Sequence, residues 1–225
     1  GKTTNQLIQL AQQVSSHPNR REMDMLLSTG ERVSMALVSM ALLDLGAPAI
    51  SFTGSQSGIL TDDSHENAFI QDVKAFRVEE ALAKNKIVVL AGFQGVSPTT
   101  KEITTLGRGG SDTTAVAMAA FLQADHCEIL KDVPSVFSAD PNCVTNVKAL
   151  NELSYDEMLD MTFWGAKVLH YRSVELAKSC GVEMYVGPAR QQNTAENTRN
   201  NNYAGTWIFA RNNSHVESIL AKSSA

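Results

Sequence analysis

The sequence predicts an α/β fold, a three-layer α/β/α sandwich with a mainly parallel central sheet. Short apolar segments alternate with helical segments along the chain, and polar glycine-rich loops follow several of the apolar segments. Hydrophobic residues make up 43% of the chain, which is enough to bury a core. Ligands of such folds gather at the carboxyl ends of the strands, so the glycine loops are the expected site.

Two helices are predicted in the first part of the chain. Apolar residues recur at helical spacing over residues 5–14. A second, buried helix is expected over residues 33–45, with Glu31 and Arg32 in its first turn and Gly46 ending it. The dipole of a helix favours an acidic residue near the helix start. On this segment alone, that effect explains Glu31 better than a ligand role does.

The next segments alternate between apolar strands and polar turns. A strand is expected at residues 49–52, followed by a polar glycine loop at 53–58. Residues 61–67 are typical of a turn, and His65 within them is expected to be an exposed loop residue, because no ligand-spaced Cys or His accompanies it. A helix over 78–83, a strand over 87–91 and a glycine turn over 92–95 complete this part.

The glycine loop at residues 104–114 reads Thr-Thr-Leu-Gly-Arg-Gly-Gly-Ser-Asp-Thr-Thr and precedes a helical run. Glycines let a backbone approach a ligand closely, and the first turn of a helix favours anions. Arg108 adds a planar fork for a carboxylate or phosphate, and Ser111 or Asp112 is expected to cap the helix. A solvated arginine in an ordinary glycine turn is an equal alternative on the loop alone, since it matches neither the Walker A nor the dinucleotide pattern.

The second half of the chain continues the alternation. Ser154 and Glu157 have capping-box spacing, so a helix is expected to begin there and run to about residue 163. His170 has no acidic neighbour in the sequence, which favours a structural role over a general base. The remaining elements are a strand at 128–130, a turn-rich excursion at 133–142, a helix at 171–179 and a strand at 182–186.

Composition narrows the class of protein. The net charge of −5 and the lack of a basic stripe argue against nucleic acid, and no apolar run reaches membrane-spanning length. Three widely spaced cysteines favour free thiols, with no metal pair, and a cytoplasmic location. We expect a domain over residues 1–186, then a polar loop, a last strand at 204–209 and a tail within 187–225.

Several segments in order resemble the aspartate kinases of the amino acid kinase superfamily. The resemblance covers residues 1–186 and implies a catalytic domain that phosphorylates the β-carboxylate of L-aspartate with ATP and Mg²⁺, towards lysine, threonine and methionine. It also implies a homo-oligomer in the complete protein. The matching segments are Met25–Ser34, Ser51–Gln56, Ala91–Gly95, Thr104–Thr114, Ser138–Pro141 and Gly165–His170.

The resemblance also assigns the site residues. Arg108 matches the arginine that clamps the substrate α-carboxylate, Glu31 matches the acid that pairs with the amino group, and Asp112 is the second catalytic candidate. Gly109, Gly110 and Ser111 line the same pocket. The expected nucleotide-binding residues are Lys131, Asp132, Phe137, Asn142, Lys167 and Val168, with no protein metal ligand.

Some features depart from the family pattern. Phe137 replaces a tyrosine, Asn142 replaces an arginine, and Pro134-Ser135 replaces an Asp-Gly pair. The family's opening strand, ending in Lys-Phe-Gly-Gly-Thr-Ser, has no match, nor have its regulatory domains, so the chain is interpreted as an incomplete catalytic domain with little turnover of its own. The alternatives are a non-catalytic fragment that binds aspartate and nucleotide, or another amino acid kinase such as glutamate 5-kinase.

Overall fold

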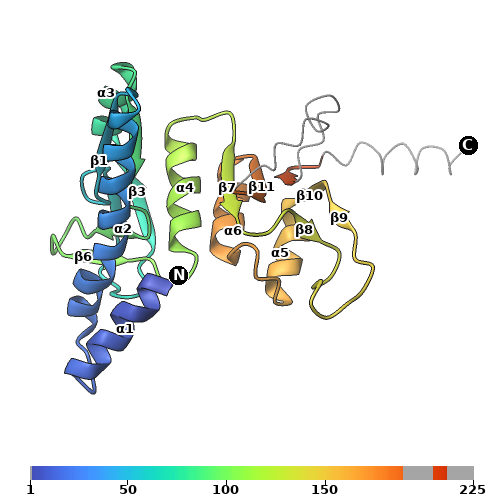
Figure 1. Ribbon diagram of the computed structural model, residues 1–225, viewed down its shortest axis with the longest axis horizontal. Helices are drawn as coiled ribbons and strands as arrows, with labels where there is room; N and C mark the ends of the chain where they lie inside the picture. The colour runs from blue at the N-terminus through green and yellow to red at the C-terminus, as the bar shows by residue number, and fades with distance from the viewer. Residues whose placement is uncertain (1, 190–204, 212–225) are drawn as a thin grey trace, which may run out of the picture. The chain divides into compact units, whose positions relative to one another are not determined.

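The computed structural model describes residues 2–189 and 205–211 (Figure 1). The chain divides into two compact units, residues 1–124 and 125–225, and both combine helices with strands, which confirms the predicted α/β class. The elements of the first unit are α1 (Lys2–Val14), α2 (Arg20–Asp44), β1 (Ala49–Phe52), β2 (Ile59–Thr61), β3 (Ile70–Val73), α3 (Phe76–Ala83), β4 (Ile87–Leu90), β5 (Gln94–Val96), β6 (Ile103–Thr105) and α4 (Gly110–Phe121).

Helix α2 begins much earlier than the sequence predicted. Its N-cap is Asn19, whose side chain accepts a hydrogen bond of 2.9 Å from the Arg21 N–H. The helix runs through Gly30, because packing against α1 and the strands outweighs the cost of about 1 kcal/mol that a glycine brings to a helix. Glu31 and Arg32 therefore lie in the middle of α2, where the dipole of a helix start cannot explain the carboxylate.

Helix α2 is also long and apolar enough to cross a membrane by length and composition alone, so the expectation that no segment reaches spanning length was wrong. Here α2 packs against β1, β4 and β6, but Val33, Leu37 and Met40 on it stay 59, 60 and 59% exposed. The expectation that residues 33–45 form a buried helix was therefore wrong, because only one face of α2 contacts the strands. These contacts make α2 one of the helices that cover the strands of the first unit.

The parallel pair of β1 and β4 has helices on both faces. Phe52 of β1 belongs to a buried cluster with Val78 and Ala81 of α3 and Met118 of α4, and alternate residues of β1 and β4 pack against it. Successive strand residues point to opposite faces. Helix α2 contacts both strands but contributes nothing to this cluster, so it covers the other face. This is the helix–sheet–helix layering that was predicted.

A second sheet in the first unit was not predicted. Its strand order is β3-β2-β5-β6, with β2 parallel to β5 and the two outer pairings antiparallel. Its strands are three or four residues long and carry polar residues such as Gln94, Thr104 and Thr105, so no continuous apolar run marks them in the sequence. Because β6 ends at Thr105, this strand leads into the turn that carries Arg108.

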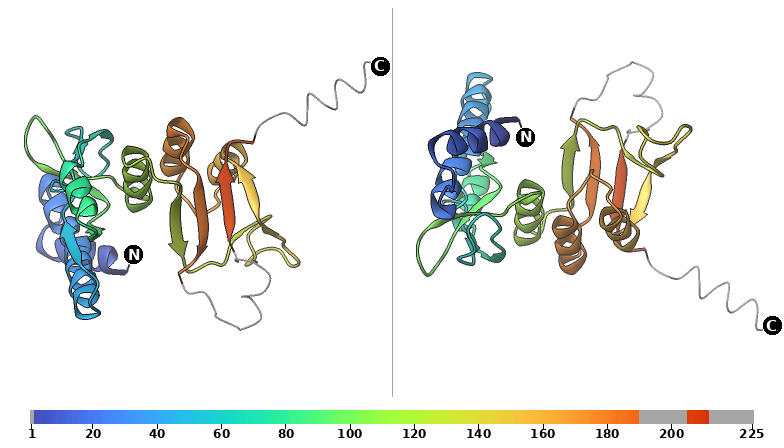
Figure 2. Two further views of the ribbon diagram at one scale, coloured as in Figure 1. Left: turned by 90° about the horizontal axis from the view of Figure 1, so that it is seen from above. Right: turned by 90° about the horizontal axis from the view of Figure 1, so that it is seen from below.

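The second unit contains a four-stranded sheet in the order β10-β12-β11-β7, drawn side by side in Figure 2. Strand β7 is parallel to β11 and β10 is parallel to β12, whereas β11 and β12 are antiparallel. The elements of this unit are β7 (Cys127–Lys131), β8 (Val136–Phe137), β9 (Ala149–Leu150), β10 (Glu152–Ser154), α5 (Tyr155–Phe163), α6 (Tyr171–Cys180), β11 (Met184–Pro188) and β12 (Thr206–Phe209). Strand β12 lies within the range where a last strand was expected, whereas most of the polar loop before it falls outside the described residues.

Local sequence signals are confirmed in the second unit. The Ser154 hydroxyl accepts a hydrogen bond of 3.2 Å from the Glu157 N–H, and the Glu157 carboxylate accepts one of 2.7 Å from the Ser154 N–H. This capping box holds the pKa of Glu157 below its ordinary value. His170 is the N-cap of α6, where its Nδ1 accepts from the Arg172 N–H at 3.3 Å, so its predicted structural role is confirmed.

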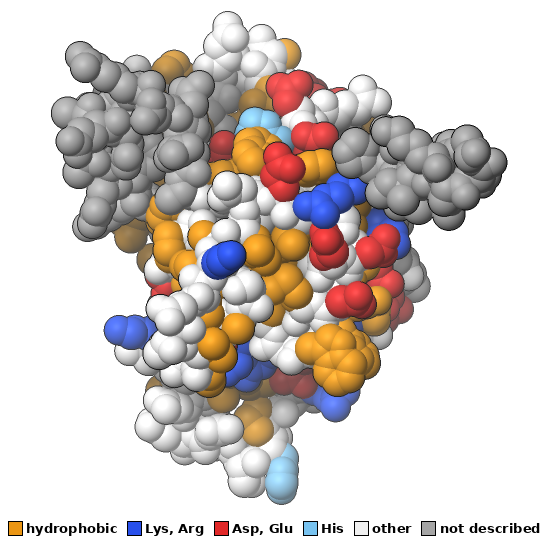
Figure 3. Space-filling view, turned by 90° about the vertical axis from the view of Figure 1, so that its right-hand side faces the viewer, with side chains coloured by type: hydrophobic (Ala, Val, Ile, Leu, Met, Phe, Trp, Pro, Cys, Tyr) orange, Lys and Arg blue, Asp and Glu red, His pale blue; other side chains and the backbone are white. Residues whose placement is uncertain are grey.

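The charged side chains and the cysteines are arranged as the composition of the chain indicates. Acidic and basic side chains are interspersed with apolar ones on the face drawn in Figure 3. All three cysteines are free, with Cys127 buried and Cys143 and Cys180 exposed. The expectation of free thiols is thus confirmed.

Candidate active site

The three polar glycine loops of the first unit lie next to one another. A Cβ built on Gly54 would be 2.1 Å from the carbonyl oxygen of Gln94, and one on Gly92 would be 3.5 Å from the Cα of Ser111. A Cβ on Gly110 would be 3.0 Å from the ring of Phe93. The loops at residues 53–58, 92–95 and 104–114 therefore meet, and their glycines are the residues that allow the close approach.

Helix α4 begins directly after the turn that carries Arg108. Its N-cap is Gly109 in the left-handed conformation, φ +72°, and no side chain caps it. Ser111 and Asp112 lie inside the first turn, so the prediction that one of them is the N-cap was wrong. A glycine cap leaves the first N–H groups of the helix without a capping side chain, and this is an arrangement that suits a bound anion.

Arg108 is exposed in the turn before α4. Within the part of the chain that the structure describes, its guanidinium makes no hydrogen bond or ion pair. A guanidinium beside uncapped helix N–H groups offers a carboxylate both charge and fork geometry. A carboxylate or a phosphate would find both features in this turn, and the assignment of Arg108 to a substrate carboxylate stays a prediction.

Glu31 is half-buried on α2, and its burial raises the pKa of the carboxyl group above the ordinary value of 4.5. An ionised carboxylate in such a place gains from a bound cation such as an ammonium group. The first unit thus has a carboxylate on α2 that a bound cation would stabilise, and a guanidinium on the loop before α4 that a bound anion would pair with.

Replacing Glu31 by Gln should make the folded chain more heat-stable at pH 7, not less. A raised pKa in the folded state means that the folded chain holds this proton more tightly than the unfolded chain. Its stabilising contribution is full below about pH 4.5 and is lost as the pH rises through the raised value. Thermal melts at pH 4 and pH 7 should show the gain at pH 7 only. A lower melting temperature at pH 7 would indicate that the carboxylate is already paired.

The structure ties α2 to the strands that lead to Arg108. Gln94 of β5 donates through Nε2 to the carbonyl of Ser28 at 3.0 Å and accepts at Oε1 from Nε of Arg32 at 3.1 Å. Gln94 is paired in register with Thr105, three residues before Arg108. Glu31 and Arg108 thus lie on two connected elements of the same unit, and their joint action on one ligand stays a prediction.

The expected nucleotide-binding residues all lie in the second unit. Lys131 ends β7 at the carboxyl edge of a parallel pair, with exposed Asp132 after it, and half-buried Phe137 lies in β8. Asn142 is exposed and bonds to Asp140 through its Nδ2 at 3.0 Å. The other two residues, Lys167 and Val168, lie in the connection between α5 and α6. Their role in binding ATP remains a prediction.

A buried polar network around Asp24 was not predicted from the sequence. His65 was expected to be an exposed loop residue, but its Nδ1 lies 2.6 Å from the carboxylate of Asp24, which is fully buried in α2. The signal that could have revealed it is a lone acid inside the apolar run of residues 23–27. A buried carboxylate requires partners, and the nearby turn supplies them.

Comparison with known proteins identifies close relatives. The model of the amino acid kinase family matches residues 1–188. An aspartokinase from Geobacillus stearothermophilus is 52% identical over 199 residues, which are 88% of this chain and 47% of that protein. The chain thus spans about half the length of the curated relatives it matches.

Solved structures agree with the sequence comparison. The aspartate kinase from Synechocystis superposes with a TM-score of 0.77 at 46% identity, covering 94% of this chain and 33% of that one. E. coli aspartokinase III in complex with aspartate and ADP has a TM-score of 0.77 at 26% identity, covering 95% and 46%. These matches and the family model together show that the chain belongs to the amino acid kinase family.

Proposed function

We propose that this chain carries most of the catalytic domain of an aspartokinase, which transfers the γ-phosphoryl group of ATP to the β-carboxylate of L-aspartate. The observation that supports this best is the turn before α4, where exposed Arg108 precedes a helix start capped only by Gly109. Its relatives are aspartokinases, one of which binds aspartate and ADP. We assign residues 1–186 to this domain, in agreement with the extent of the family match.

In this proposal Arg108 and the N–H groups of Gly109 and Ser111 hold the α-carboxylate, and Glu31 holds the α-ammonium group. Gly110 only lines the same pocket, because its own N–H donates to the Gly107 carbonyl at 3.1 Å. The β-carboxylate then attacks the γ-phosphorus. A new bond forms between its oxygen and phosphorus as the bond from phosphorus to the bridging oxygen of ADP breaks. No general base is needed because the attacking carboxylate is ionised near neutral pH. Asp112, in the first turn of α4, is the second catalytic candidate on this surface.

The second unit would supply the nucleotide contacts through Lys131, Asp132, Phe137, Asn142, Lys167 and Val168. In residues 2–189 and 205–211 no group of three or more His, Cys, Asp or Glu could hold a metal ion. We expect Mg²⁺ to accompany ATP through its phosphates, as in other phosphoryl-transfer enzymes. We further propose a cytoplasmic location, suggested by the free cysteines, and a homo-oligomer for the complete protein.

The reaction can be tested by trapping the acyl phosphate with hydroxylamine. We expect a protein that joins this chain to the family's Lys-Phe-Gly-Gly-Thr-Ser strand to form a hydroxamate that requires both aspartate and Mg-ATP. The 225 residues alone should form very little, because the lysine of that strand neutralises the transferring phosphoryl group. Parallel reactions with glutamate test the glutamate 5-kinase alternative. A folded, extended protein that binds both ligands without forming hydroxamate would support the non-catalytic alternative instead.

A further inference from the structure

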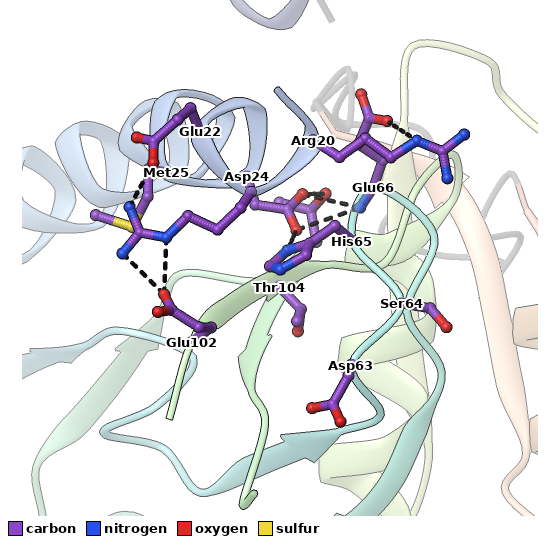
Figure 4. A network of polar contacts seen from close by, with 12 residues as sticks. Arg20, Glu22, Asp24, Met25, Asp63, Ser64, His65, Glu66, Glu102 and Thr104 are labelled. Atoms are coloured by element: carbon purple, nitrogen blue, oxygen red, sulfur yellow. Dashed lines mark hydrogen bonds and ion pairs between the residues drawn. The ribbon is translucent and has the colours of Figure 1, made fainter. Parts of the chain in front are cut away.

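The carboxylate of Asp24 is the centre of a buried network in the first unit (Figure 4). It accepts hydrogen bonds from the Thr105 hydroxyl at 2.5 Å and from the Glu66 N–H at 3.0 and 3.2 Å. His65 Nδ1 lies 2.6 Å from its second oxygen. Asp24 and Thr105 are both fully buried, so the bond between them forms away from water, where an unpaired partner is costly.

The partners of Asp24 belong to three segments that are distant in the sequence. Asp24 lies on α2, His65 and Glu66 lie in the turn between β2 and β3, and Thr105 is the last residue of β6. The turn also bonds to β6 directly, because the Ala68 N–H donates to the Thr105 carbonyl at 2.9 Å. The network therefore joins a helix, a turn and a strand end at one point.

The turn between β2 and β3 also supports the glycine loop. A Cβ built on Gly107 would be 2.8 Å from Oδ1 of Asn67 and 3.0 Å from the carbonyl oxygen of Glu66. Glu66 has a φ of +66°, a conformation that non-glycine residues rarely adopt. Its N–H donates to Asp24 in that conformation, so the carboxylate holds the turn in the shape that contacts Gly107.

The two residues expected to bind aspartate, Glu31 and Arg108, follow members of this network closely in the sequence. Glu31 follows Asp24 by seven residues on α2, which places the two side chains on the same face, about 10 Å apart along the axis. Arg108 follows Thr105 by three residues. A change at Asp24 or Thr105 would therefore alter the position of the Arg108 turn relative to the helix that carries Glu31.

We propose that Asp24 and Thr105 are positioning residues for aspartate binding: their hydrogen bond, with the turn at residues 62–68, fixes the Arg108 turn relative to Glu31. Neither side chain contacts the substrate in this proposal. The inference rests on the proposed function, because it presumes that Arg108 and Glu31 share one ligand.

Adjacent buried threonines provide a matched test. Thr105→Val removes the hydroxyl that donates to Asp24, whereas Thr104→Val removes one whose partner, among the residues that the structure describes, is Thr61 of β2 at 2.5 Å. Both threonines are fully buried. Calorimetric titration of the chain should show Thr105→Val weakening aspartate binding roughly tenfold and leaving ATP binding unchanged, whereas Thr104→Val changes neither by more than about twofold. Thr105→Ser should restore aspartate binding.

The outcomes separate this inference from the proposed function. If the chain without any substitution does not bind aspartate, both the proposed function and the positioning role are contradicted. Aspartate binding that Thr105→Val leaves intact, or that Thr104→Val weakens equally, overturns the positioning role alone. Should Thr105→Val fail to fold, His65→Gln gives the same test, because His65 is a partly exposed member of the network. That variant should weaken aspartate binding selectively as well, and equal losses of aspartate and ATP binding would overturn the inference.

Discussion

Replacing Arg108 with alanine should weaken aspartate binding by a factor of roughly 10 to 100 and leave ATP binding nearly unchanged. A hydrogen bond to a charged group contributes about 1.5–3 kcal/mol, and this guanidinium is the group that we expect to hold the α-carboxylate. The ATP-binding candidates lie in the other unit of the chain. In the enzyme, the KM for aspartate should rise far more than the KM for ATP.

The stability of the Arg108→Ala variant should stay within about 0.5 kcal/mol of the unchanged chain, since the side chain is exposed. Arg108→Lys keeps the charge but loses the fork, so an intermediate loss of aspartate binding is expected. Lys84→Ala removes one positive charge at the end of α3 and serves as the control for general electrostatics. Equal effects of Arg108→Ala on aspartate and ATP would place Arg108 in a different subsite.

The parts of the fold that could be predicted from the sequence are those with a local cause. The capping box of Ser154 and Glu157 sets the start of α5, and Gly181 ends α6 in the left-handed conformation, φ +69°. The apolar strand β1 begins and ends where its sequence pattern does. In each case a few adjacent residues determine the backbone, so one sequence is sufficient evidence.

The parts that could not be predicted depend on contacts between distant segments. Gly30 is an ordinary helix-ending signal, yet α2 continues through it because α1 and the strands pack against the helix. The candidate site divides in the same way. The turn around Arg108 is local and visible in the sequence, whereas the bond between Asp24 and Thr105 spans 81 positions and has no sequence pattern.

Gly58→Ala should destabilise the chain by roughly 3 kcal/mol or more, a large part of the stability of a typical domain. Gly58 has a φ of +78°, and a Cβ there would lie 2.0 Å from the carbonyl oxygen of Lys74 and 2.4 Å from its carbon. Those are backbone atoms, and the Lys74 N–H donates to the Gly58 carbonyl at 2.9 Å, so the two segments cannot separate without losing that bond. Chemical denaturation measures the loss.

The Gly46→Ala variant separates the two causes of the destabilisation expected for Gly58→Ala, which are the left-handed conformation and the steric clash. Gly46 has nearly the same φ, +79°, but a Cβ there would meet no atom within 4 Å. The left-handed conformation alone costs alanine about 1 kcal/mol, so Gly46→Ala should lose about that much, and the difference from Gly58→Ala should measure the steric clash. Equal losses would mean that the segment around Lys74 moves freely. In that case the loop at residues 53–58 would not be held firmly against its neighbours, and its approach to Gln94 beside the candidate site would also have to be flexible.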